Sequence, residues 1–266
     1  MVRFATLSSG SNGNCCCISN GRESLLIDIG IGGRTVKKRL EALGIDIASV
    51  SLVLVSHDHF DHIRSLGTFT MRFKRPVCAP LQVLDSLERH YCTAGCFAGC
   101  RRPLLLGEEN DLGWVTVTPF EVPHDATFTV GYHIRLVEED CRFTFLTDLG
   151  EVTDEAVRYA SMADHLVVEA NYDVDMLLRG HYPPELKRRI MSGNGHLSNE
   201  QTASLLKRSL HDSLRNVWLC HLSEQNNTPE LALRAVRRAL PHGSATTLSC
   251  LPRREAALFD LRDPTP

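Results

Sequence analysis

Residues 56–62 (SHDHFDH) constrain this chain more than any other stretch, because they place three histidines and two aspartates within seven positions. The residues just before them, 50–56 (VSLVLVS), are rich in β-branched side chains and predict a buried strand. Such crowding of ionisable groups at a strand end is favourable when a cation neutralises it, and imidazole and carboxylate are good metal ligands. We therefore predict a metal site at the carboxyl end of this strand.

The spacing within this motif predicts two ions. His57 and His59 alternate around Asp58 and would ligate one ion, whereas Asp61 and His62 would ligate a second. Imidazole and carboxylate together suit Zn, Mn or Fe, so the sequence leaves the metal open among these three.

Two neighbouring ions need a bridging carboxylate and further ligands from elsewhere in the chain. The candidates are polar residues that end other β-like runs, namely His124, Asp148 and His221. Asp148 is the candidate bridge, because a layered α/β domain brings strand ends to one rim. For His124 the alternative is a structural histidine that forms hydrogen bonds and binds no metal.

The order of predicted elements indicates an α/β fold. The 266 residues, 43% of them hydrophobic, are enough for one full core. The predicted strands cover residues 3–7, 15–19, 24–30, 50–56, 114–122, 128–136, 141–150, 165–171 and 216–221. The predicted helices cover residues 33–44, 153–161, 198–210 and 228–240. Two β-rich halves, each with covering helices, predict a single domain over residues 1–266. Residues 63–110 show no strong period.

The ten cysteines do not resemble a disulfide framework. Cys15, Cys16 and Cys17 are consecutive, and we expect them to be small buried apolar residues in a reducing compartment. Residues 92–100 repeat Cys every fourth position, which would align three thiols if the segment were helical. A core stripe or a loop is the favoured interpretation over a thiolate metal site, since two glycines interrupt the segment.

Charge and hydropathy exclude some partners. The N-terminus does not resemble a signal peptide, and no apolar run is long enough to cross a bilayer, so we expect a cytoplasmic protein without a membrane partner. The net charge of -3 argues against a strongly basic nucleic-acid surface but allows a local basic groove. The oligomeric state stays open.

The metal motif, with a later His, Asp and His, resembles the metallo-β-lactamase superfamily. Residues 7–14 (LSSGSNGN), 25–30 (LLIDIG), 168–190, 195–201 (GHLSNEQ) and 221–232 resemble its YycJ/WalJ branch, which is similar to RNase Z and other nucleases. The resemblance implies an αβ/βα four-layer sandwich, two divalent metal ions and phosphodiester hydrolysis. It further implies a DNA exonuclease acting 5′ to 3′, with a part in mismatch repair.

The resemblance also distributes roles over the candidate residues. One ion would take His57, His59 and His124, and the other Asp61, His62 and His221, with Asp148 shared. Asp28 would support the metal loop, and Tyr172 stands where the family leads us to expect a histidine. Glu169 and His196 would lie beside the scissile phosphate, with His196 as proton donor and Asp61 orienting the nucleophile.

Substrate contacts are predicted at two places in the sequence. Ser11 and Asn14 lie in a Gly/Ser/Asn loop (residues 8–14) that would form either a phosphate-binding nest or a plain tight loop. Basic clusters occur at residues 37–39, 72–75, 101–102, 187–189 and 237–238. Lys187 and Arg188 are the best candidates for holding a nucleic acid, because they precede His196 closely. The expected nucleic acid is DNA rather than RNA.

Three other functions compete with a nuclease. A hydrolase of a small thiolester, lactone or lactam is the first alternative, and the Glu169–His196 pair argues against it because the superfamily's small-substrate enzymes generally lack that pair. A binding protein merely stabilised by metal is the second, but structural zinc sites are usually cysteine-rich. A diiron oxidoreductase is the third, and the superfamily's oxidoreductases carry Glu where this chain has His59.

Overall fold

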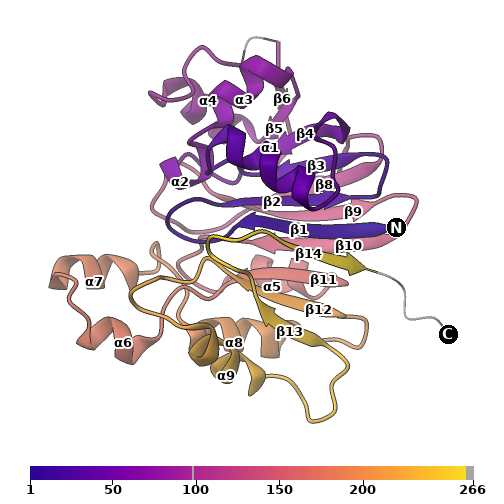
Figure 1. Cartoon of the computed structure of the whole chain (residues 1–266). Coiled ribbons are helices and arrows are strands. Elements are labelled where there is room, and N and C mark those ends of the chain that lie inside the picture. The colour runs from indigo at the N-terminus through magenta and orange to yellow at the C-terminus, as the bar shows by residue number, and fades with distance from the viewer. Residues whose placement is uncertain (98, 262–266) are drawn as a thin grey trace. The chain divides into compact units, whose positions relative to one another are not determined.

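The computed structural model describes residues 1–97 and 99–261, which form two compact units. Unit 1 contains residues 1–105, 126–128 and the C-terminal residues from 252, and unit 2 contains residues 106–125 and 129–251. Figure 1 shows the helices and strands of both units. Each unit has one seven-stranded mixed sheet with helices beside it.

The sheet of unit 1 has the strand order β14-β1-β2-β3-β4-β5-β6. Its strands are β1 (Val2–Ser8), β2 (Cys15–Ser19), β3 (Ser24–Ile27), β4 (Val50–Leu54), β5 (Val77–Ala79), β6 (Arg101–Pro103) and β14 (Ala257–Leu261). Its helices are α1 (Gly33–Ala42), the 3-10 turn η1 (Ile47–Ser49), α2 (Phe60–Ile63), α3 (Leu66–Phe73) and α4 (Leu81–Arg89). The strands from β14 to β3 pair antiparallel, and those from β3 to β6 pair parallel.

The sheet of unit 2 has the order β13-β12-β11-β10-β9-β8-β7. Its strands are β7 (Asn110–Asp111), β8 (Val115–Glu121), β9 (Val130–Leu136), β10 (Cys141–Leu146), β11 (His165–Glu169), β12 (Asn216–Cys220) and β13 (Thr247–Cys250). Its helices are α5 (Asp154–Ala160), α6 (Val174–Arg179), α7 (Pro184–Ile190), α8 (Asn199–Ser209) and α9 (Pro229–Arg237). Again an antiparallel part, β7 to β10, continues into a parallel part, β10 to β13.

Local sequence signals explain many of these boundaries. The Asn20-Gly21 turn joins β2 to β3, and the Asn20 side chain accepts hydrogen bonds from the backbone of Arg22 and Glu23. Helix α8 begins with the predicted capping box, in which Ser198 and Gln201 satisfy each other's backbone N–H groups. Helices α5 and α9 begin at the predicted N-caps Thr153 and Thr228. The α/β class predicted from the element order is confirmed.

The cysteines behave as small buried or half-buried side chains. None of the ten forms a disulfide. Cys15, Cys16 and Cys17 are buried in β2, where burial raises the pKa of the Cys17 thiol to about 12. The segment around Cys92 and Cys96 is a turn and not a helix, so its thiols do not line one helix face. Among residues 1–97 and 99–261, none of the groups that could hold a metal includes a cysteine.

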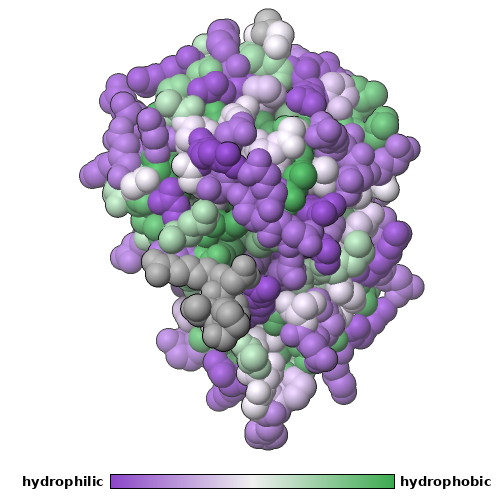
Figure 2. Space-filling view, turned by 90° about the vertical axis from the view of Figure 1, so that its right-hand side faces the viewer, coloured by the Kyte–Doolittle hydropathy of each residue, from purple (hydrophilic) through white to green (hydrophobic). Residues whose placement is uncertain are grey.

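In segment 63–110, which had no readable period, the described residues form the helices α3 and α4 and the short strands β5 and β6, and β7 begins at its end. Among the described residues no helix is long and apolar enough to cross a membrane. The face in Figure 2 is mostly hydrophilic, and its hydrophobic residues lie in small groups between polar ones. The apolar residues of unit 2 are instead gathered in a core where β10, β11 and β12 pack against α5, α8 and α9.

His133 on β9 makes the stability of the fold pH-dependent. Burial, helped by the positive charge of Arg142, lowers its pKa from 6.5 to about 4. The unfolded chain therefore takes up the proton first, and this contribution to stability is lost as the pH falls from 6.5 towards about 4. When the pH is lowered from about 7 to about 5, the free energy of unfolding should fall by about 1–2 kcal/mol less in His133→Gln than in the wild type. Urea unfolding at both pH values measures this, and equal losses in the two proteins would contradict it.

Candidate metal centre and catalytic site

In unit 1 the predicted ligands of residues 56–62 lie directly after β4. His57 and His62 are fully buried, whereas His59 and Asp61 are half-buried. His59 occupies the N-cap position of α2, and Asp61 lies in the first turn of that helix. The ring of His57 has its centroid 4.7 Å from that of His59 and 4.2 Å from that of His62. The three imidazoles are therefore neighbours within one unit.

Asp28, directly after β3, orients two of these histidines. Its Oδ2 accepts a hydrogen bond from His62 Nδ1 at 2.7 Å and from the Ser56 hydroxyl at 2.8 Å. Because the single Ser56 hydroxyl proton points to Asp28, His57 Nδ1, 2.9 Å from Ser56 Oγ, must be the donor in that contact. Both rings thus carry their proton on Nδ1 and their lone pair on Nε2, as metal-ligating histidines do.

We expect Asp28→Ala to lower metal affinity about tenfold to a hundredfold, because His62 and Ser56 lose the carboxylate that orients them. The Asp28 backbone has a φ of +59°, a conformation that Asn tolerates better than Ala. Asp28→Asn is therefore the matched variant, with the same shape but a neutral side chain. Metal titration with a chelating dye measures the affinity, and an Asp28→Ala protein as tight as the wild type would contradict this role.

The predicted substrate residues Ser11 and Asn14 have different surroundings. Ser11 is exposed at the tip of the Gly/Ser/Asn loop. Asn14 is buried, and its Nδ2 lies 2.9 Å from His62 Nε2 and 3.2 Å from Asp61 Oδ2. The backbone also ties this loop to the motif, since Asn14 N donates to Asp61 O at 2.8 Å. The geometry of Asn14 therefore favours support of the ligands over direct contact with a substrate.

Gly30 explains why this loop approaches so closely. A Cβ at this position would lie 1.6 Å from the carbonyl oxygen of Asp61 and 2.7 Å from the backbone nitrogen of Asn14. Only glycine allows β3, the loop and α2 to meet, and the sequence alone offered no signal for this requirement.

In unit 2 the predicted acids and histidines lie at the carboxyl ends of three adjacent parallel strands. Asp148 follows β10, Glu169 ends β11 and His221 follows β12. Asp148 and His221 have φ values of +50° and +52°, an uncommon conformation for non-glycine residues that is enriched at functional sites. The shared edge of parallel strands therefore brings together residues that are far apart in the sequence.

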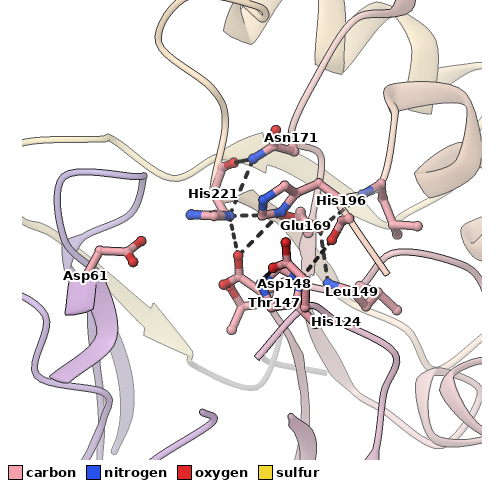
Figure 3. A network of polar contacts seen from close by, with 12 residues as sticks. Asp61, His124, Thr147, Asp148, Leu149, Glu169, Asn171, His196 and His221 are labelled. Carbon is pink, nitrogen blue, oxygen red and sulfur yellow. Dashed lines mark hydrogen bonds and ion pairs between the residues drawn. The ribbon is translucent and has the colours of Figure 1, made fainter. Parts of the chain in front are cut away.

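Glu169 lies between His196 and His221, as Figure 3 shows. Its Oε1 is 2.7 Å from His196 Nδ1 and 2.9 Å from His221 Nδ1, and its Oε2 accepts from the backbone N–H groups of Leu149 and Leu197. His221 Nδ1 is also 2.8 Å from Asp148 Oδ1. The Asn171 amide donates to the His221 carbonyl oxygen at 2.9 Å, a contact that sequence reasoning did not find.

The electrostatics of this cluster favour a charged Glu169–His196 pair. Burial alone lowers the pKa of His196, but the charge of Glu169 and the hydrogen bond to it outweigh burial, so the pKa lies above 6.5. Burial alone raises the pKa of Glu169, and the charge and hydrogen bonds of the histidines reverse this, so it lies below 4.5. The raised pKa favours the protonated form of His196, which can donate a proton.

His124 is held in a form suited to metal binding. Its Nδ1 donates to the Gly195 carbonyl oxygen at 2.8 Å, so Nε2 carries the lone pair. Burial, together with the charge of His196, lowers its pKa despite the nearby acids, which favours the neutral ring. The adjacent Asp125 forms an ion pair with Arg189 of α7, another contact absent from the sequence analysis.

These residues fit a divalent cation. Asp148, Glu169, His196 and His221 form a group whose candidate donor atoms lie within 4.8 Å of one another. With His196 protonated and paired with Glu169, Asp148 and His221 are the donors left for the cation. A mixed set of imidazole and carboxylate donors matches Zn, Mn or Fe. The two units thus supply histidine nitrogens in the ligand tautomer and a buried carboxylate cluster.

The remaining predicted substrate residues lie on α7, which has no buried residue. Lys187 Nζ donates to the carbonyl oxygens of Leu178 and Gly180, both at 2.7 Å, and so stabilises the end of α6. Arg188 is exposed. The geometry leaves Arg188 better placed than Lys187 to meet a ligand.

The fold and these sites define a metal-dependent hydrolase. The chain belongs to the family described as "Beta-lactamase superfamily domain", whose sequence model matches residues 24–221. It is 31% identical over 230 residues to "Exodeoxyribonuclease WalJ" of Streptococcus pneumoniae serotype 2 (strain D39 / NCTC 7466), covering 86% of this chain and 85% of that protein. It is also 31% identical over 239 residues to "Exodeoxyribonuclease YycJ" of Bacillus anthracis, covering 90% of this chain and 89% of the relative.

A solved structure shares the fold. The metallo-β-lactamase fold protein YhfI from Bacillus subtilis superimposes with a TM-score of 0.72 at 14% sequence identity, over 98% of this chain and 100% of that one. The predicted superfamily and the predicted fold class are therefore confirmed.

Proposed function

We propose that this chain is a metal-dependent phosphodiesterase, and more narrowly a DNA exonuclease that works 5′ to 3′. The Glu169–His196 pair carries the proposal, because it places a protonated imidazole beside the carboxylate cluster that can hold a cation. The two relatives named exodeoxyribonuclease, matched over most of their length, support DNA over RNA as the substrate. A part in mismatch repair and a cytoplasmic location belong to the same proposal.

We propose that two divalent ions are bound. His57, His59 and His124 would hold one ion, and Asp61, His62 and His221 the other, with Asp148 shared. When bound, such ions supply Lewis-acid chemistry to a phosphodiester. We also propose that residues 1–266 act as one catalytic domain, because the family match at residues 24–221 extends across both units.

The remaining steps belong to side chains of the protein. Asp61 would orient the attacking water, and His196 would give a proton to the leaving oxygen. Because His196 Nδ1 is engaged by Glu169 at 2.7 Å, the proton to be donated is the one on Nε2. The charge of Glu169 keeps that ring protonated and fixed in orientation.

One assay separates this function from the thiolester, lactone or lactam alternative. Purified protein with Mn or Zn receives a 5′-phosphorylated duplex DNA and, separately, a lactoylglutathione-type thiolester. We expect cleavage of the DNA, blocked by phosphorothioate linkages at the 5′ end and unaffected by the same linkages at the 3′ end. Turnover of the thiolester with intact DNA would refute the nuclease assignment.

A further inference from the structure

A basic cavity lies in unit 2 beyond the residues of the candidate catalytic site. It has a volume of about 670 Å³ and is formed by the last turns of α9 and the loop that leads to β13. Its polar lining consists of Arg234, Arg237, Arg238, His242, Ser244 and Thr246. This volume lies within the roughly 300–1,000 Å³ typical of ligand sites.

The charged side chains that line the cavity are all basic. Arg234, Arg237 and Arg238 are exposed and spaced so that they share one face of α9, and none of the residues lining the cavity is acidic. Within the described part of the chain, no carboxylate forms an ion pair with these three arginines. By contrast, Arg208 pairs with Asp154, and Arg189 pairs with Asp125.

The position of these arginines near a helix C-terminus has an ordinary explanation. The helix dipole favours cations there. It does not account for three like charges within one turn around a cavity, because like charges at this spacing repel. An anion with several negative charges would relieve that repulsion.

The loop of the cavity is internally ordered and carries hydroxyl groups. Ser244 Oγ donates to Thr246 Oγ1 at 3.1 Å, and Thr246 Oγ1 in turn donates to the Leu214 carbonyl oxygen at 2.8 Å. Ser244 Oγ also accepts from the Thr246 backbone N–H at 3.2 Å. Both hydroxyl protons are thus used inside the loop. The guanidinium groups are therefore the donors that this cavity offers to phosphate oxygens.

The cavity lies at the edge of the sheet opposite the acids and histidines. Thr247, which follows it, pairs with Asn216 at the beginning of β12, whereas His221 follows the end of that strand. Five strand residues rise about 16 Å, and the nine residues of α9 rise about 14 Å, so a ligand that reaches both ends must be a polymer several nucleotides long.

We propose that this α9 cavity binds backbone phosphates of the nucleic-acid substrate, several nucleotides away from the scissile bond. The proposal rests on the proposed nuclease function and adds to it a second contact that anchors the polymer. A free mononucleotide has the same phosphate chemistry, but it is too short to link the two ends of the sheet.

The test compares two triple variants of the full chain. Arg234→Gln, Arg237→Gln and Arg238→Gln together remove the charge of the cavity. Arg34→Gln, Arg89→Gln and Lys207→Gln together remove the same charge from scattered exposed positions. Binding to a labelled DNA of about 30 nucleotides is measured by anisotropy in EDTA over a range of salt concentrations.

We expect the cavity variant to bind DNA about tenfold to a hundredfold more weakly, with a slope of log affinity against log salt that is smaller by about 2–3. The control variant should keep the wild-type slope. Cleavage of bis(p-nitrophenyl) phosphate, which is too small to reach the cavity, should be unchanged in both variants.

Equal affinities and slopes for the two variants would overturn the proposal. Binding of a mononucleotide is measured by calorimetry. If the wild type binds it and the cavity variant does not, the cavity is a mononucleotide site, and the proposal that it binds a polymer is overturned. Failure of the proposed function looks different, because the wild type itself would then neither bind nor cleave the DNA.

Discussion

His59→Ala is expected to lose bound metal and turnover together. His59 is half-buried at the N-cap of α2 and its side chain does not cap that helix, so its removal should leave the fold intact. The proposed first ion would keep only His57 and His124 as its own histidines, and its affinity should fall by more than about a hundredfold. Turnover of DNA should fall by about a thousandfold or more, because the reaction depends on that ion.

The measurement is metal content by mass spectrometry after reconstitution, beside the DNA cleavage rate and a thermal unfolding curve. His211→Ala is the matched control, since His211 is half-buried outside the proposed ligand set and its Nδ1 contacts Ser213 Oγ at 2.9 Å. A His59→Ala protein with wild-type metal content would remove His59 from the ligand set.

Substitution of Glu169 should have the largest effect on stability. The side chain is fully buried and accepts from two backbone N–H groups while it contacts His196 and His221. In Glu169→Leu these partners lose their acceptor, and we expect a loss of about 3–5 kcal/mol in the free energy of unfolding. Denaturant unfolding measures it, and a loss below about 1 kcal/mol would contradict the role of Glu169 as the centre of the cluster.

Glu169→Gln separates charge from packing. The amide keeps the shape, so most of the stability should remain, but its NH₂ group would face Nδ1 of His196 and His221. His196 would then lose its Nδ1 proton, and His221 would move its proton to Nε2. His221 would then lose its ligand lone pair, and we expect metal affinity to fall about tenfold to a hundredfold. Metal affinity in Glu169→Gln equal to the wild type would show that the carboxylate charge is not needed.

The pH dependence of this cluster follows from the two shifts. His196, with its pKa raised above 6.5, adds stability below that pH and loses it as the pH rises through its folded-state pKa. Glu169, with its pKa lowered below 4.5, adds stability above that pH and loses it as the pH falls further. The pair therefore contributes most between 4.5 and 6.5. Glu169→Gln should lose this maximum, so its stability should change less than that of the wild type as the pH falls below 4.5 or rises above 6.5.

The fold class was predictable because it depends on local patterns. Alternating and continuous apolar runs predicted most strands, and the caps at Thr153, Ser198 and Thr228 marked helix starts because their side chains bond to the helix's own backbone. The motif at residues 56–62 needed no tertiary information, since its crowded ionisable groups by themselves indicate a cation.

Segment 63–110 was not predictable, because its short strands depend on pairing with a neighbour, β5 with β4 and β6 with β5, and not on their own periodicity. The different roles of Lys187 and Arg188 were also not predictable, because they too depend on contacts in the folded chain. Both are basic residues on α7, and only the folded chain shows that Lys187 Nζ donates hydrogen bonds to the carbonyl oxygens of residues 178 and 180.

The sequence by itself therefore determined which residues carry donor atoms that suit a cation, since donor chemistry belongs to the side chain. Tertiary structure decided which residues orient them. Asp28 bonds to His62, Gly195 to His124 and Glu169 to His221 across 34, 71 and 52 positions of sequence. Parallel strands bring such distant residues to one edge, and no local pattern encodes which strands will be neighbours.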